Sequence, residues 1–287
     1  MSTLPEDIKS QRSLYVITAH QFNHVDRGIA IDPRFVAPGF DTKFYFVDAA
    51  GAPPGFPHDH VEERLINPAI GPAGGRLLAE WSFLLTEFEK PFATYPFFMV
   101  SSRFFEKNAR LTTDFSTVMA KAFDALKPYG WGYLPSYDRP ANFQDMADYR
   151  QKGYLGIKDE GIAYIDGFYG VRLIDEYRHI ADFFCNYIGF QSREHLVAYV
   201  QFYLPFIRRF LDADWNVIRD PELYVRRTNT YRNEKPFTFL LEMMSHLFFC
   251  MNRLKFVGVS YDGIYEVDEN AVVLTPLTKW DPAAGPA

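Results

Sequence analysis

Short apolar segments of strand-like composition alternate with longer segments of helical periodicity over the first half of the chain. The stretches SLYVIT (13–18), KFYFVD (43–48) and YPFFMVSS (95–102) are rich in β-branched and aromatic residues, which is typical of buried strands. Apolar residues recur at helical spacing in 74–90, and a Thr/Asp capping cluster precedes the helical pattern of 112–127. This alternation favours an α/β fold with a mostly parallel sheet, because parallel strands need long crossover connections.

The second half of the chain has a different pattern. Amphipathic segments predict long helices at 173–188, 194–210 and 236–255. Glycines interrupt the apolar stretch IAYIDGFYGVR (162–172), which predicts a strand pair or a bent strand. A last strand is expected at 256–267.

These patterns predict a single α/β domain over residues 13–275 that becomes helix-rich from about residue 173. The polar start (1–12) and the Pro/Ala-rich end (276–287) are expected to be flexible. No composition shift marks a further domain boundary.

The charge balance argues against nucleic-acid binding. The chain has 30 basic and 36 acidic residues, a net charge of −6, and no basic run that could follow a phosphate backbone. No segment is long and apolar enough to span a membrane, and the polar start lacks the apolar core of a signal peptide. The sequence therefore predicts a cytoplasmic protein and leaves peripheral attachment to a membrane open.

Polar residues follow two of the predicted strands. TAHQFNH begins at Thr18, and SSRFFEKNAR begins at Ser101. Ligands of parallel sheets lie beyond the carboxyl ends of the strands, and Arg103 with the adjacent hydroxyls would suit phosphate oxygens. The competing interpretation is that Thr18 and His20 cap a turn and that the basic residues begin a solvated helix.

Three acidic residues stand out. Asp166 lies in an apolar stretch and could act as a general base, although an Asp-Gly turn explains it equally simply. Asp212 and Asp214 form an Asp-x-Asp, a pattern that can hold a divalent metal. The preceding apolar residues have helical spacing, and a helix C-terminus disfavours carboxylates. A solvated helix end is therefore the better interpretation of this pair, which stays a candidate metal site only.

Several segments together resemble a family of bacterial capsular-polysaccharide-type glycosyltransferases with a GT-A-like nucleotide-sugar fold. The resemblance rests on LYVITAHQF, on INPAIGPAGGRLLAEWSFLLTEF, on YPFFMVSSRFF and, further along, on PFTFLLEMMSHLFF. It covers most of residues 13–255 at thin identity. Where the family has His-Tyr-Arg-Arg, this chain has Ser101-Ser102-Arg103-Phe104, so one arginine is retained.

The resemblance implies a GT-A-like, Rossmann-type fold and transfer of a sugar from a UDP-, GDP- or TDP-linked donor to a glycan acceptor in surface polysaccharide synthesis. Asp166 would be the base, and Mg²⁺ or Mn²⁺ could hold the leaving diphosphate. The expected donor site consists of Thr18, Ala19, His20, Arg76, Glu80, Ser101, Ser102 and Arg103.

Two other function classes stay open. A metal-dependent hydrolase or oxygenase could use His20, His24, Asp26, His58 and His60, whose side chains are metal ligands in many proteins. A non-catalytic glycan-binding module could instead use the abundant aromatic residues as a binding face. The chain has no P-loop, no Gly-x-Gly-x-x-Gly and no Gly-x-Ser-x-Gly, so kinase, dehydrogenase and α/β-hydrolase interpretations lose their usual support.

Overall fold

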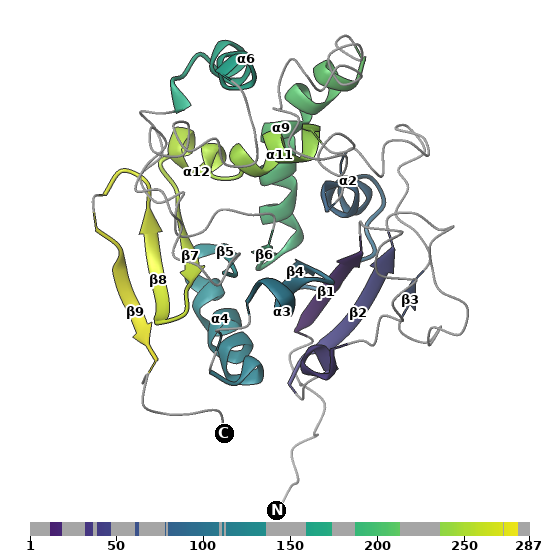
Figure 1. Cartoon of the computed structure of the whole chain (residues 1–287), viewed down its shortest axis with the longest axis vertical. Coiled ribbons are helices and arrows are strands. Elements are labelled where there is room, and N and C mark those ends of the chain that lie inside the picture. The colour runs from purple at the N-terminus through teal and green to yellow at the C-terminus, as the bar shows by residue number, and fades with distance from the viewer. Residues whose placement is uncertain are drawn as a thin grey trace, which may run out of the picture.

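One nine-stranded sheet with the order β3-β2-β1-β4-β6-β5-β7-β8-β9 is the centre of the fold, which was obtained as a computed structural model (Figure 1). The structure describes residues 12–18, 32–36, 39–46, 61–62, 78, 80–108, 111, 113–135, 159–173, 187–212, 236–271 and 273–280. The strands are β1 (Ser13–Thr18), β2 (Asp41–Phe46), β3 (Val61–Glu62), β4 (Phe97–Ser101), β5 (Trp131–Tyr133), β6 (Ile188–Phe190), β7 (Lys255–Val259), β8 (Gly263–Asp268) and β9 (Thr275–Lys279). The helices are η2 (Pro33–Val36), α2 (Trp81–Glu89), α3 (Phe104–Lys107), α4 (Phe115–Tyr129), α6 (Asp159–Tyr169), α9 (Arg193–Asp212), α11 (Pro236–Met243) and α12 (Leu247–Asn252).

The sheet is mixed rather than mostly parallel. Strands β3, β2, β1 and β4 are parallel neighbours, and β5 is parallel to β7. Strand β6 runs antiparallel between β4 and β5, and β7, β8 and β9 form an antiparallel meander. The prediction of a GT-A-like, Rossmann-type, mostly parallel sheet is therefore wrong: four of the eight neighbouring pairs are antiparallel.

The expected helical C-terminal half is wrong for the same reason, since β6 to β9 all come from it. The stretch 256–267 is a hairpin of β7 and β8 around Asp262, not one strand. Strand β9 pairs with β8 and includes residues 276–279, which had been assigned to a flexible tail. Conversely, the stretch expected to form a strand pair, 162–172, lies largely in helix α6.

Each face of the sheet carries its own hydrophobic core (Figure 1). Helices α2, α6, α9, α11 and α12 cover one face, and η2, α3 and α4 cover the other. Strand β1 shows why this works: Tyr15 and Ile17 enter the first core, whereas Leu14 and Val16 enter the second. A strand buried on both faces must be apolar throughout, which is how SLYVIT reads. We call the first of these faces the α9 face.

Helix α4 illustrates local sequence control. The Asp114 side chain accepts a hydrogen bond from the Thr117 N–H at 2.9 Å, which caps the first turn. The helix ends at Gly130, whose φ of 87° lies in the left-handed region that favours glycine. Among the described residues no helix is both long and apolar enough to cross a membrane.

A buried carboxylate fixes the loop between α2 and β4. Glu87 is fully buried, and its Oε2 accepts hydrogen bonds from the N–H groups of Phe92 and Ala93 at 2.7 and 2.8 Å. Its Oε1 accepts one from the Tyr95 hydroxyl at 2.9 Å. Burial, followed by the nearby Glu87 charge, raises the pKa of Tyr95 well above its usual value. The loop thus depends on one acid for three hydrogen bonds.

Candidate functional site

The carboxyl ends of β1 and β4 meet at a point where the strand order changes direction. From β1 the chain proceeds to β2 on one side, and β4 later pairs with the other side of β1. Ile17 lies opposite Ser101, and the Ser102 N–H donates to the Ile17 carbonyl at 3.0 Å. Thr18 and the Ser101–Arg103 segment are therefore neighbours. The loops that leave such strands diverge, and ligands of open α/β sheets bind in the resulting crevice.

The side chains of this segment differ in burial. Ser101 is 3% exposed and Thr18 is 7% exposed, whereas Ser102 and Arg103 are half-buried. Phe104 and Phe105, the next two residues, are buried in the core on the α4 side and anchor the short helix α3. The sequence SSRFF therefore becomes a tight turn in which two polar residues lie between a buried strand and a buried aromatic pair.

Two tyrosines from later in the chain hold this segment. The Ser101 hydroxyl and the Tyr187 hydroxyl are 2.7 Å apart, and both residues are buried. At the other end of α3, the Asn108 Oδ1 accepts a hydrogen bond from the Tyr261 hydroxyl at 2.7 Å. Asn108 is itself fully buried and donates to the Phe104 carbonyl at 2.9 Å. We call Tyr187 and Tyr261 the two tethers of segment 101–108.

The tethers are functional candidates that the sequence analysis missed. Tyr187 immediately precedes the three-residue strand β6, and Tyr261 lies in the turn after β7. They are separated from their partners by 86 and 153 residues along the chain. No local pattern marks either tyrosine, because the contact depends on how β6 and β7 are inserted in the sheet.

Glu80 and Asp166 belong to other elements. Glu80 lies at the N-terminus of α2 and is 7% exposed. Asp166 lies in α6 rather than in a strand, and its Oδ1 accepts a hydrogen bond from the Leu173 N–H at 2.8 Å. Val171 N–H also donates to the Asp166 carbonyl at 3.1 Å. Asp166 thus ties the end of α6 to the following turn, and its role as a base stays a prediction.

The remaining predicted site residues fall mostly outside the described part of the chain. These are Ala19, His20, Arg76 and Asp214, together with the metal ligands of the alternative hypothesis, His24, Asp26, His58 and His60. Asp212 is the last residue of helix α9, as its helical spacing predicted. Within the described residues, no group of three or more His, Cys, Asp or Glu side chains could hold a metal ion.

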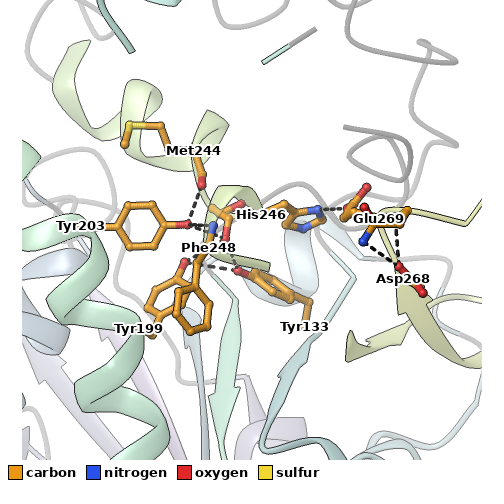
Figure 2. Close-up of polar contacts among 10 residues, drawn as sticks. Tyr133, Tyr199, Tyr203, Met244, His246, Phe248, Asp268 and Glu269 are labelled. Atoms are coloured by element: carbon orange, nitrogen blue, oxygen red, sulfur yellow. Dashed lines mark hydrogen bonds and ion pairs between the residues drawn. The ribbon is translucent and has the colours of Figure 1, made fainter. Parts of the chain in front are cut away.

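A second polar cluster is buried under the α9 face, where α11 and α12 are separated by a turn (Figure 2). The Ser245 carbonyl accepts hydrogen bonds from the hydroxyls of Tyr133, Tyr199 and Tyr203 at 2.8, 3.2 and 3.1 Å. The Tyr203 hydroxyl also lies 2.7 Å from the Met244 carbonyl and accepts from the Phe248 N–H at 3.0 Å. We call this group the tyrosine cluster.

An ion-pairing couple adjoins the tyrosine cluster. His246 Nδ1 and Glu269 Oε1 are 2.7 Å apart, and both side chains have no exposed surface (Figure 2). The His246 ring also contacts the Tyr133 ring, with centroids 4.9 Å apart. The couple links the turn between α11 and α12 to the end of β8. Because all of these residues are buried, the cluster and the couple stabilise the helix break rather than present groups to solvent.

The geometry therefore concentrates accessible polar chemistry at one place, the turn formed by Ser102 and Arg103 beside Thr18. Arg103 supplies a permanent positive charge with several donors, and the hydroxyls supply neutral donors and acceptors. Such a set can bind the oxygens of a phosphate or diphosphate. Comparison of the chain with protein-family models, with curated proteins and with solved structures gave no match.

Proposed function

We propose that the chain is a glycosyltransferase that takes a sugar from a nucleoside-diphosphate donor and passes it to a glycan acceptor. The observation that carries this proposal is the meeting of β1 and β4 at a change of strand direction, with Thr18, Ser102 and Arg103 at the strand ends. The resemblance of the sequence segments adds the reaction class. The same segment supplies both arguments, since YPFFMVSSRFF contains β4 and the turn.

In this proposal Arg103 stabilises the diphosphate as it leaves the sugar. Cleavage of the bond between the anomeric carbon and the phosphate oxygen leaves negative charge on the diphosphate, and a nearby guanidinium lowers the energy of that state. The hydroxyls of Thr18 and Ser102 would orient the phosphate oxygens. A Mg²⁺ or Mn²⁺ ion would do the same task as Arg103. The described residues do not form a site for such an ion, so no step here depends on one.

The first test is a thermal-shift titration with UDP, GDP and TDP, each with and without Mn²⁺. At a concentration of about 100 times Kd, a ligand that binds the folded state adds about 2.7 kcal/mol of stability, which moves the melting temperature measurably. We expect at least one of the three nucleotides to stabilise the protein. No stabilisation by any of them would reject the transferase proposal.

The second test asks whether the diphosphate binds at the turn. Arg103→Ala should raise the nucleotide Kd about ten- to hundred-fold, because a hydrogen bond to a charged group contributes about 1.5–3 kcal/mol. The control is Arg12→Ala, which removes the same charge. Arg12 pairs with Asp124 at 2.8 Å and directly precedes β1, so it lies at the opposite edge of the sheet. Equal Kd values for Arg103→Ala and the unmodified protein would remove Arg103 from the site.

A further inference from the structure

Ser101 is the most deeply buried polar residue at the end of β4, and its hydroxyl is already engaged. It lies 2.7 Å from the Tyr187 hydroxyl, with both residues almost fully buried. The Ser102 N–H is also engaged, because it donates to the Ile17 carbonyl. The groups of this turn that remain for a ligand are therefore the side chains of Ser102 and Arg103, and Ser101 serves to fix their starting point.

We propose that Tyr187 is a positioning residue for the phosphate site: through Ser101 it fixes the turn that carries Ser102 and Arg103. This inference rests on the proposed function, since it assumes that the turn binds a nucleoside diphosphate. Tyr187 enters from the residue before β6, and its ring packs on Phe104 with centroids 5.5 Å apart. It therefore contacts the residue before the turn through its hydroxyl and the residue after the turn through its ring.

The second tether supports the same conclusion from the far end of α3. Tyr261 donates to Asn108, and Asn108 in turn donates to the Phe104 carbonyl at the start of that helix. Segment 101–108 is therefore held at both ends by tyrosines from later parts of the chain. A turn of a few residues between two fixed points loses little further freedom when a ligand binds, which favours affinity.

The variant Tyr187→Phe tests the inference because it removes one hydroxyl and keeps the ring. We expect its Kd for the stabilising nucleotide to rise roughly two- to ten-fold, the effect of one buried hydrogen bond. The matched control is Tyr199→Phe. Tyr199 is equally buried, at 2% exposed, and its hydroxyl bonds to the Ser245 carbonyl in the tyrosine cluster. Both variants should melt at a lower temperature, but only Tyr187→Phe should bind the nucleotide more weakly.

A double-mutant cycle then tests whether Tyr187 acts through Ser101. We expect the double variant Ser101→Ala/Tyr187→Phe to bind no more weakly than Ser101→Ala alone, because the second change removes a partner that is already lost. Multiplying effects would overturn the inference, and so would an unchanged Kd in Tyr187→Phe when the unmodified protein binds a nucleotide. If the unmodified protein binds none of UDP, GDP and TDP, the proposed function itself fails, which the variants are not needed to show.

Discussion

The Tyr203 hydroxyl makes an unusually demanding set of hydrogen bonds, and its removal should cost more than removal of its neighbour in the tyrosine cluster. Tyr203 is fully buried. Its oxygen lies 2.7 Å from the Met244 carbonyl and 3.0 Å from the Phe248 N–H. The hydroxyl can donate one hydrogen and accept another, so it satisfies both groups at once. Phe248 lies in the first turn of α12, where an N–H has no partner within the helix.

The two groups are not equally vulnerable in a Tyr203→Phe variant. The Met244 carbonyl keeps a hydrogen bond from the Leu247 N–H at 2.8 Å. The buried Phe248 N–H loses the acceptor that the structure shows. A lost buried hydrogen bond costs about 1 kcal/mol, and an unpaired buried donor a further 1–3 kcal/mol. We therefore expect the free energy of unfolding to fall by about 2–4 kcal/mol.

Tyr199→Phe is the comparison. The Tyr199 hydroxyl is 3.2 Å from the Ser245 carbonyl, which keeps a shorter hydrogen bond from Tyr133 at 2.8 Å. No donor or acceptor of the backbone is left unpaired, so the loss should be about 0.5–1.5 kcal/mol. Equilibrium unfolding in urea measures both values, with a constant m value as the check that the comparison is valid. Equal losses in the two variants would refute the assignment of the Phe248 N–H to Tyr203.

Three further variants test other described contacts. Glu87→Ala should lower the free energy of unfolding in urea by about 3–5 kcal/mol, because two backbone N–H groups lose their acceptor, and a loss below about 1 kcal/mol would contradict that. Burial lowers the pKa of His195, so the folded state disfavours the charged ring; stability is complete above pH about 6.5 and falls as pH drops toward the lower folded pKa. His195→Gln should flatten that fall in melts from pH 7 to 5, and an unchanged pH profile would exclude His195 as its cause. Asp166→Asn should lower sugar-transfer turnover more than nucleotide affinity if Asp166 is the base, and full turnover would reject that role.

The sequence predicted the elements whose pattern is local. The strands at 13–18 and 95–102 are continuous apolar runs, and β1 and β4 form within them. The helix expected at 112–127 is α4, with Asp114 from its capping cluster at the N-cap. These features depend on neighbours in sequence, so composition and period are sufficient to find them.

The sheet as a whole could not be predicted in this way. Strand β6 has only three residues, and its first residue had been assigned to the end of a helix. Gly189 in its centre allows a close approach: a Cβ there would lie 2.3 Å from the Phe98 side chain. A three-residue strand held by a single close contact carries no period of its own. The antiparallel centre of the sheet depends on this strand, which is why the parallel prediction failed.

The candidate site divides along the same line. The neighbourhood of Thr18 and Ser101 follows from the rule that parallel strands end at one edge, and the register of β1 and β4 agrees with it. The tethers could not be found, because Tyr187 and Tyr261 reach the site only after β6 and β7 have joined the sheet. Asp166 was assigned to a strand because its glycines suggested a bend, whereas Gly167 lies inside α6.

The position of β6 also determines when the sheet can be completed as the chain is synthesised. Strand β4 pairs with β1 on one side early, but its other side pairs with β6, and β5 pairs with β6 and β7. A nascent chain therefore carries an open edge on β4 and two on β5 until residues 188–190 have left the ribosome. Open strand edges are the surfaces through which incomplete chains aggregate. Translation pauses before this short strand should therefore lower the yield of folded protein more than pauses after β7.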